Sequence, residues 1–214
     1  MNRINVINLI QEKYNFSKYL EIGLRRPDDC FNHIQCTTKH SVDPGFETQN
    51  NTATYPFTSD DFFKKLKSNQ LDLPVDYKWD IIFIDGLHLA PQVEKDILNS
   101  LEHLSEKGII VLHDCNPFLY EDNYTRLIEE YWNQPWNGTV WKSIYKLRTS
   151  RHDLSICTIN LDEGLGLIKK GSQDLIPFNN PYFEYRVFQK EVKSALNTID
   201  YSEIHNWLNS EINI

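Results

Sequence analysis

The chain lacks any long apolar run, and polar residues interrupt its N-terminus from Asn2 onward. A signal peptide and a membrane-spanning helix both need such a run, so we expect neither. The chain also has no excess of cations, because its net charge is −8 and its pI is about 5.3. Surfaces for nucleic acid or for anionic membranes need clustered cations. We therefore expect neither of these partners.

Cysteine is scarce, and none of the four cysteines belongs to a CxxC pair. A disulfide framework would need more of them at regular spacing, so we expect reduced thiols and a cytoplasmic protein. Internal repeats, low-complexity tracts and Gly/Ser linkers are absent as well. Since 214 residues suit one domain of ordinary size, we expect a single domain over residues 1–214.

Two short apolar runs, residues 79–84 and 108–112, are the most informative part of the sequence. Runs this short and rich in β-branched residues are typical of strands buried on both faces. Residues 89–104 between them have apolar side chains at helical spacing. The three segments predict a βαβ unit whose strands are parallel neighbours.

Acids and imidazoles follow both of these strands. Asp85 and His88 follow the first strand, and His113 and Asp114 follow the second. A right-handed crossover brings both strand ends to one edge of the sheet, where ligands of open α/β sheets bind. We therefore expect these four side chains to form one cluster.

Further strands and helices are predicted on both sides of this unit. In order, the predicted strands are 19–22, 39–42, 52–57, 79–84, 108–112, 154–159 and 165–168. A turn too short for a crossover joins the last two, which predicts an antiparallel pair at the sheet edge. Helices are expected after Thr58 or Ser59, over 124–132 and 140–147, and through most of the C-terminal extension, 180–214.

Four short motifs follow one another at strand-like spacing. They are Tyr19-Leu20-Glu21-Ile22-Gly23, Ser41-Val42-Asp43-Pro44, Phe83-Ile84-Asp85-Gly86-Leu87-His88 and Ile110-Val111-Leu112-His113-Asp114. In this order they resemble the motifs of class I S-adenosylmethionine-dependent methyltransferases, and they are similar to the methyltransferase-24 type, which is related to macrocin-type sugar O-methyltransferases. The resemblance covers about residues 17–168 and implies a Rossmann-like α/β fold with a seven-stranded, mainly parallel sheet, an antiparallel edge pair and extra C-terminal helices.

The resemblance implies that S-adenosylmethionine is the cofactor and that Glu21, Gly23, Asp43 and Asp85 bind it. Glu21 and Gly23 would flank its methionine end, because a glycine lets the backbone approach closely. Asp43 ends the second strand, where nucleotide-binding folds place an acid that accepts hydrogen bonds from ribose. The alternative for Gly23 and Asp43 is that each only shapes a turn.

The chain departs from the family directly after Gly23. Further glycines would be expected there, whereas this sequence has Leu24-Arg25-Arg26-Pro27. Arg25 and Arg26 are suited to bind a carboxylate or phosphate, so another anionic ligand is an alternative to the cofactor.

Asp85 and Asp114 end adjacent strands, and carboxylates placed in this way can share Mg²⁺ or another divalent cation. The resembled sugar and catechol-type O-methyltransferases use acids at these strand ends for that purpose. The cation would lower the pKa of an acceptor hydroxyl, and His113, preferred over His88, would act as general base. A metal-free variant needs only His113 and an acid that orients it. The structural alternative is that Asp85 caps the next helix and His113 lies in the core.

The leading hypothesis is an S-adenosylmethionine-dependent O-methyltransferase that acts on a sugar or another small hydroxylated metabolite. The other hypotheses are an enzyme that binds a different anionic ligand through Arg25 and Arg26, and a non-catalytic methyltransferase-like partner subunit. Aromatic residues after Pro117, Trp136 above all, are candidates for a lid or for the core. Those over 182–188 are expected to pack internally or to form a homodimer face.

Overall fold

The computed structural model describes residues 1–117 and 136–210. The chain divides into two compact units, of which unit 1 is Met1–Leu87 with Val93–Val111 and unit 2 is His88–Gln92 with Leu112–Ile214. Within the described residues, no helix has the length and apolar character needed to cross a membrane. The predicted helix over 124–132 lies outside the described residues, and the single domain stays a prediction.

Seven strands form the sheet, in the order β2-β1-β3-β4-β6-β5-β7. Every pairing that involves β1 is parallel, whereas β5 and β6 run antiparallel. The predicted Rossmann-like α/β fold is therefore confirmed. The strands are β1 (Lys18–Ile22), β2 (Thr38–Val42), β3 (Trp79–Ile84), β4 (Leu104–Leu112), β5 (Leu154–Ile159), β6 (Leu165–Lys170) and β7 (Thr198–Ile199).

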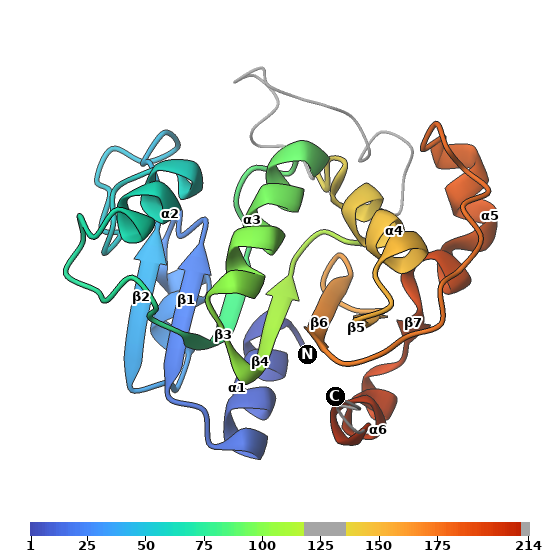
Figure 1. The fold of residues 1–214 in the computed structure, drawn as a ribbon, viewed down its shortest axis with the longest axis horizontal. Helices are drawn as coiled ribbons and strands as arrows, with labels where there is room; N and C mark the ends of the chain where they lie inside the picture. Colours follow the sequence, from blue (N-terminus) through green and yellow to red (C-terminus); the bar gives the residue numbers. More distant parts are fainter. Residues whose placement is uncertain (118–135, 211–214) are drawn as a thin grey trace. The chain divides into compact units, whose positions relative to one another are not determined.

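In unit 1, β1 lies between β2 and β3 and pairs in parallel with both (Figure 1). Ile22 lies opposite Val42 on one side and opposite Ile84 on the other. Both faces of β1 are buried after Lys18, and they carry the apolar side chains of Leu20 and Ile22 together with Tyr19 and the Glu21 carboxyl. This register places the residues that follow the three strands at the same edge of the sheet.

The predicted helices over 89–104 and 140–147 correspond to two α-helices with bounds within three residues of those predicted. The N-cap of α2 is Thr58, one of the two predicted candidates, because its side chain accepts a hydrogen bond from the Asp61 amide at 3.2 Å. The α-helices are α1 (Arg3–Tyr14), α2 (Ser59–Lys67), α3 (Ala90–Glu102), α4 (Val140–Ser150), α5 (Tyr185–Leu196) and α6 (Ile204–Asn209), and the short 3₁₀ helices are Pro27–Asp29, Phe31–His33 and Tyr201–Glu203.

The predicted strand over 52–57 is wrong. Tyr55 alone pairs there, in an isolated parallel bridge to Val42. Its amide donates to the Ser41 carbonyl at 2.9 Å, but the next residue is Pro56, which has no N–H to continue a ladder. The seventh strand is instead β7, which the sequence analysis placed in a helical extension.

In unit 2, the predicted antiparallel pair is confirmed, with Leu154 of β5 opposite Lys170 of β6. The pair lies in the edge region of the sheet, as predicted, and only the two-residue strand β7 pairs with β5 outside it, in parallel. Asn197 ends α5 in the left-handed conformation, and its side-chain amide donates to the Ile156 carbonyl at 2.8 Å. This contact returns the chain to β5 and lets Thr198 pair.

The C-terminal aromatic residues pack against α4. The Trp141 ring stacks on Phe188 of α5 with centroids 4.0 Å apart, and Tyr185 and Phe188 are both buried. Internal packing is therefore confirmed for these two residues and Trp141. Tyr182 is 84% exposed, and the homodimer stays a prediction.

Candidate functional site

Glu21 is a buried carboxyl near the end of β1, with only 2% of its surface exposed. The Tyr19 hydroxyl donates a hydrogen bond to its Oε2 at 2.5 Å. Burial raises the pKa of Glu21 from 4.5 to about 8, although the Tyr19 hydrogen bond and the Arg3 cation act in the opposite direction. The protonated carboxyl therefore predominates at neutral pH.

Asp85 follows β3 and forms an ion pair with Arg3. The Arg3 Nη1 lies 2.7 Å from the Asp85 Oδ2, and the two side chains are 24% and 19% exposed. Arg3 begins α1, 82 positions away in the sequence. The sequence analysis missed this residue, although its spacing from the buried Val6 and Ile7 places it on the buried side of α1.

Gly23 adopts a left-handed backbone with φ of 94° directly after β1. A Cβ at this position would lie 2.1 Å from the Asp85 carbonyl oxygen. Position 23 therefore requires a glycine because the backbone that follows β3 passes directly beside it. Leu24, which replaces a family glycine, is buried with 3% exposure.

Asp43 follows β2, and its carboxylate binds two backbone amides. Its Oδ2 accepts from the Arg25 amide at 3.0 Å, and its Oδ1 accepts from the Gly45 amide at 2.6 Å. These contacts are those of a turn, as the structural alternative predicted. An ionised carboxylate offers about four lone-pair sites, so both oxygens retain capacity for hydroxyl donors.

The guanidinium groups of Arg25 and Arg26 face acids rather than an empty basic pocket. Arg25 lies 3.8 Å from Glu47 and 4.0 Å from Asp29, and Arg26 lies 3.8 Å from Asp29. Both arginines are exposed. Acidic neighbours weaken the attraction of this loop for an anion.

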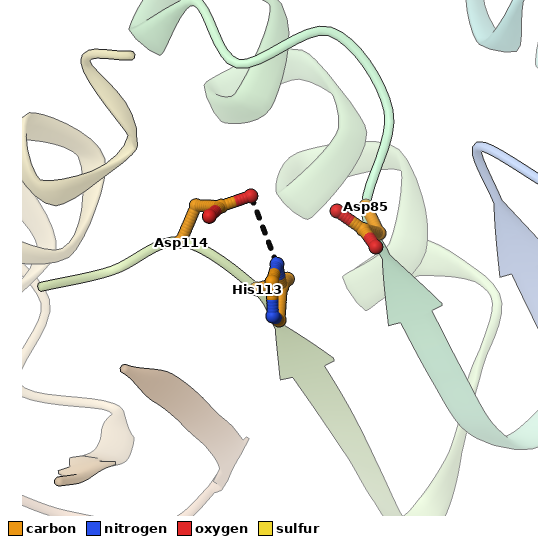
Figure 2. Close-up of side chains that lie close together, drawn as sticks. All are labelled: Asp85, His113 and Asp114. Atoms are coloured by element: carbon orange, nitrogen blue, oxygen red, sulfur yellow. Dashed lines mark hydrogen bonds and ion pairs between the residues drawn. The ribbon is translucent and has the colours of Figure 1, made fainter. Parts of the chain in front are cut away.

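In unit 2, Asp114 accepts hydrogen bonds on both carboxylate oxygens. Its Oδ2 lies 2.9 Å from the His113 Nδ1, a contact that Figure 2 marks after the end of β4. Its Oδ1 accepts from the Asn137 side-chain amide at 2.8 Å. Because a carboxylate only accepts, the His113 Nδ1 is the protonated nitrogen, and the Nε2 of the neutral ring carries the lone pair.

His88 approaches the same carboxylate from the other side. Its Nε2 lies 3.2 Å from the Asp114 Oδ2, and its Nδ1 lies 2.8 Å from the Trp136 carbonyl oxygen. Both ring nitrogens of His88 therefore face acceptors, which suits a fixed hydrogen-bonding role better than a general base. The Trp136 ring lies 5.1 Å from the His88 ring, and its role as a lid or as part of the core stays a prediction.

The turn between β5 and β6 supplies two acids that the sequence analysis treated only as turn residues. The Asp162 Oδ1 lies 3.5 Å from the His113 Nε2, and the Glu163 Oε2 accepts from the Asn137 amide at 3.2 Å. Both residues and the following Gly164 have positive φ values of 49°, 60° and 83°. The Asp-Glu-Gly sequence of the turn was the only signal for this geometry.

The structure thus brings His88, His113 and Asp114 together, as predicted, and adds Asn137, Asp162 and Glu163. Asp85 follows β3 in unit 1 (Figure 2), so its convergence with these residues stays a prediction. A divalent cation at Asp85 would lie beside the Arg3 guanidinium, and like charges repel. Asp85 therefore already has a cationic partner, which competes with a metal ion for its carboxylate.

Comparison with known proteins adds a family and a fold. Residues 20–115 match a family of methyltransferase domains. The O-methyltransferase from Bacillus cereus in complex with SAH is 12% identical, with a TM-score of 0.52 and coverage of 77% of this chain and 79% of that chain. TomG from Streptomyces achromogenes, an O-methyltransferase involved in tomaymycin synthesis and solved with SAM, is 13% identical, with a TM-score of 0.48 and coverage of 77% and 78%. No curated protein sequence matches the chain.

The likeness to the Bacillus cereus structure supports the fold, whereas the family match comes from the sequence itself. The matched segment contains every residue that the sequence analysis assigned to the cofactor or the chemistry: Glu21, Gly23, Asp43, Asp85, His88, His113 and Asp114. Residues 20–115 are therefore similar in sequence to methyltransferase domains, and the chain shares a Rossmann-like fold with the Bacillus cereus structure.

Proposed function

We propose that the protein is an S-adenosylmethionine-dependent O-methyltransferase that acts on a sugar or another small hydroxylated metabolite in the cytoplasm. One observation carries the proposal: a buried imidazole, His113, is oriented by the Asp114 carboxylate at 2.9 Å directly after β4, inside the matched methyltransferase segment. An oriented imidazole is what removal of a proton from a hydroxyl requires. The four free, buried cysteines agree with a reducing compartment.

The cofactor is assigned to the edge of the sheet in unit 1. Glu21, Gly23 and Asp85 would bind its methionine end, and Asp43 would accept hydrogen bonds from its ribose hydroxyls. The donors and acceptors present there suit such a ligand, because Asp43 keeps lone pairs for hydroxyls on both oxygens. When bound, S-adenosylmethionine supplies a methyl group on a positively charged sulfur.

The residues of unit 2 are assigned to the acceptor. With the cofactor bound, its methyl group would pass from sulfur to the acceptor oxygen and S-adenosylhomocysteine would leave. The His113 Nε2 would take the proton of the acceptor hydroxyl, and Asp114 would stabilise the imidazolium that forms. Asp162, 3.5 Å from the same nitrogen, adds a second negative charge beside that cation. Asn137 holds the Asp114 carboxylate through its other oxygen. His113 is 5% exposed, so little water competes for its nitrogen.

A divalent cation shared by Asp85 and Asp114 is the metal-assisted variant of the same proposal. The ion pair between Arg3 and Asp85 favours the metal-free variant. A chelator distinguishes them, because it should leave turnover of the metal-free enzyme unchanged. The hypothesis of another anionic ligand at Arg25 and Arg26 is weaker, since acids face both side chains.

The first test is calorimetric titration with S-adenosylhomocysteine. We expect binding, and Asp43→Ala should weaken it at least tenfold, because each hydrogen bond to a charged acceptor contributes roughly 1.5–3 kcal/mol. Asp76→Ala, which removes an exposed acid of the same unit, is the matched control and should bind like the unmodified protein. Equal affinity of Asp43→Ala and the control would refute the ribose assignment. Absence of binding would favour the non-catalytic partner.

Turnover is then measured with S-adenosylmethionine and a panel of sugars, polyols and phenols, by release of S-adenosylhomocysteine. An acceptor whose methylation depends on His113 would support the proposal. Tight cofactor binding with no turnover on any hydroxylated acceptor would contradict it.

A further inference from the structure

The first turn of α1 places one cation on the buried side of an otherwise apolar helix face. Val6, Ile7 and Ile10 are fully buried, and Arg3 precedes them by three, four and seven positions. Residues at these spacings share one face of a helix, so Arg3 continues the buried stripe toward the sheet. A guanidinium in this position costs desolvation, which its ion pair with Asp85 offsets.

Arg3 meets the sheet at the edge assigned to the cofactor. Asp85, its partner at 2.7 Å, donates its amide to the Ile22 carbonyl at 2.8 Å and approaches Gly23 closely. The Arg3 guanidinium therefore lies at the carboxyl ends of β1 and β3. Ligands of open α/β sheets bind at this edge.

A buried acid lies within electrostatic range of this cation. Burial raises the pKa of Glu21 most, and the charges of Asp85 and Arg3 shift it further, Asp85 upward and Arg3 downward. A carboxyl and a guanidinium at one edge of a sheet can bind the two charged groups of an α-amino acid. The carboxyl accepts from the ammonium group, and the guanidinium binds the carboxylate with its planar fork of donors.

We propose that Arg3 binds the α-carboxylate of the methionine portion of the cofactor, with Asp85 holding the guanidinium in place. The inference rests on the function proposed above and deepens it, because it adds a residue outside the matched segment 20–115. It also explains why the missing loop glycines are tolerated: a side chain from α1, rather than the amides of a glycine-rich loop, takes the anionic end of the ligand.

The experiment compares two ligands that differ only in the amino acid portion. S-adenosylhomocysteine carries it, and 5′-methylthioadenosine lacks it. Both are titrated into the unmodified protein, Arg3→Gln, Arg3→Lys and Lys13→Gln, the last removing an exposed cation at the other end of α1. Thermal unfolding of each variant checks that α1 remains packed.

We expect Arg3→Gln to weaken binding of S-adenosylhomocysteine by about 10- to 100-fold, as for a lost charged hydrogen bond, and to change binding of 5′-methylthioadenosine less than about twofold. Arg3→Lys should recover part of the loss, and Lys13→Gln should bind both ligands normally. An equal loss for both ligands, or none for either, would overturn the role of Arg3 while leaving the proposed function intact. If the unmodified protein binds neither ligand, the proposed function fails and this inference fails with it.

Discussion

The two units hold their candidate functional groups by different means. In unit 1, Glu21, Asp43 and Asp85 lie at or just after the ends of three parallel strands, and regular strand pairing sets their positions. In unit 2, only His113 and Asp114 follow a strand. Their partners come from residues 136–139, which also contact His88, and from the left-handed turn at Asp162. Strand pairing thus sets the positions of the candidate groups in unit 1, whereas contacts between loops set them in unit 2.

The charges of the two regions differ as well. In unit 1, the Asp85 carboxylate pairs with the Arg3 cation, and the Asp43 carboxylate accepts from backbone amides. In unit 2, the Asp114 carboxylate contacts imidazole and amide groups. Asp162 lies close to the His113 ring, and Glu163 accepts from the Asn137 amide. A region with a fixed cation suits an anionic or zwitterionic ligand. A region of imidazoles among carboxylates suits proton transfer.

The largest effect is expected where proton transfer is assigned. His113→Ala should reduce turnover about 10²- to 10⁴-fold, the usual contribution of a general base, without weakening binding of S-adenosylhomocysteine. Asp114→Asn should reduce turnover as well, because it replaces one accepting oxygen by an N–H donor and removes the charge that stabilises the imidazolium. Single-turnover rates with an identified acceptor and calorimetry with the cofactor product provide the two measurements.

His152→Ala, which removes an exposed imidazole of unit 2, is the control and should retain full activity. Full activity of both His113→Ala and Asp114→Asn would show that the chemistry lies elsewhere. Loss of cofactor binding in His113→Ala would mean that His113 also supports the cofactor, so the two regions would not have the separate roles assigned to them.

The second effect concerns Glu21, whose folded-state pKa of about 8 lies above its ordinary value of 4.5. Between these pH values the folded protein binds a proton that the unfolded chain has released, so the stability of the folded state should fall as pH rises from about 4.5 to 8. Glu21→Gln cannot release this proton. The variant should gain stability relative to the unmodified protein over this range, by at most about 5 kcal/mol.

Urea unfolding from pH 5 to pH 8.5 measures this difference. Glu106→Gln, at an exposed position of β4, serves as the control and should follow the unmodified protein. A difference between Glu21→Gln and the unmodified protein that stays constant with pH would mean that Glu21 is ionised in the folded state throughout.

The third effect concerns the backbone approach in unit 1. Gly23→Ala should destabilise the fold by about 3 kcal/mol or more, because its Cβ would lie 2.1 Å from the Asp85 carbonyl oxygen at φ of 94°. Gly86→Ala is the control, since the atom nearest to its added Cβ would be 3.7 Å away. Chemical unfolding of both variants is the measurement. Similar stabilities would mean that the ends of β1 and β3 move apart easily, which would contradict the view that strand pairing fixes their positions.

The smallest effect is expected at the turn of unit 2. Asp162→Asn keeps the size of the side chain and tolerates the left-handed backbone, but removes the charge beside the His113 Nε2. Stability should change by less than about 0.5 kcal/mol, while turnover falls up to about tenfold. Asp174→Asn, at an exposed position, should change neither. An unchanged rate in Asp162→Asn would confine the catalytic role to His113 and Asp114.

Much of the fold could be predicted because strand burial leaves a strong pattern in a single sequence. The segments that became β1 and β3 were recognised from their apolar residues, and their parallel pairing, with Leu20 opposite Ile82, agrees with the predicted parallel sheet. The strand expected over 52–57 failed, because an alternating pattern did not outweigh Pro56. The two-residue strand β7 is too short to leave any pattern.

The sequence by itself therefore determined which acids and imidazoles follow the strands, because chain position along a buried strand fixes the edge at which the next residue lies. It did not determine which of them contact one another. Only the tertiary structure brought Arg3 to Asp85 across 82 positions and brought Asn137 and Asp162 to Asp114 and His113. Such contacts depend on how α1 packs and on left-handed turn residues, and neither leaves a local periodic signal in the sequence.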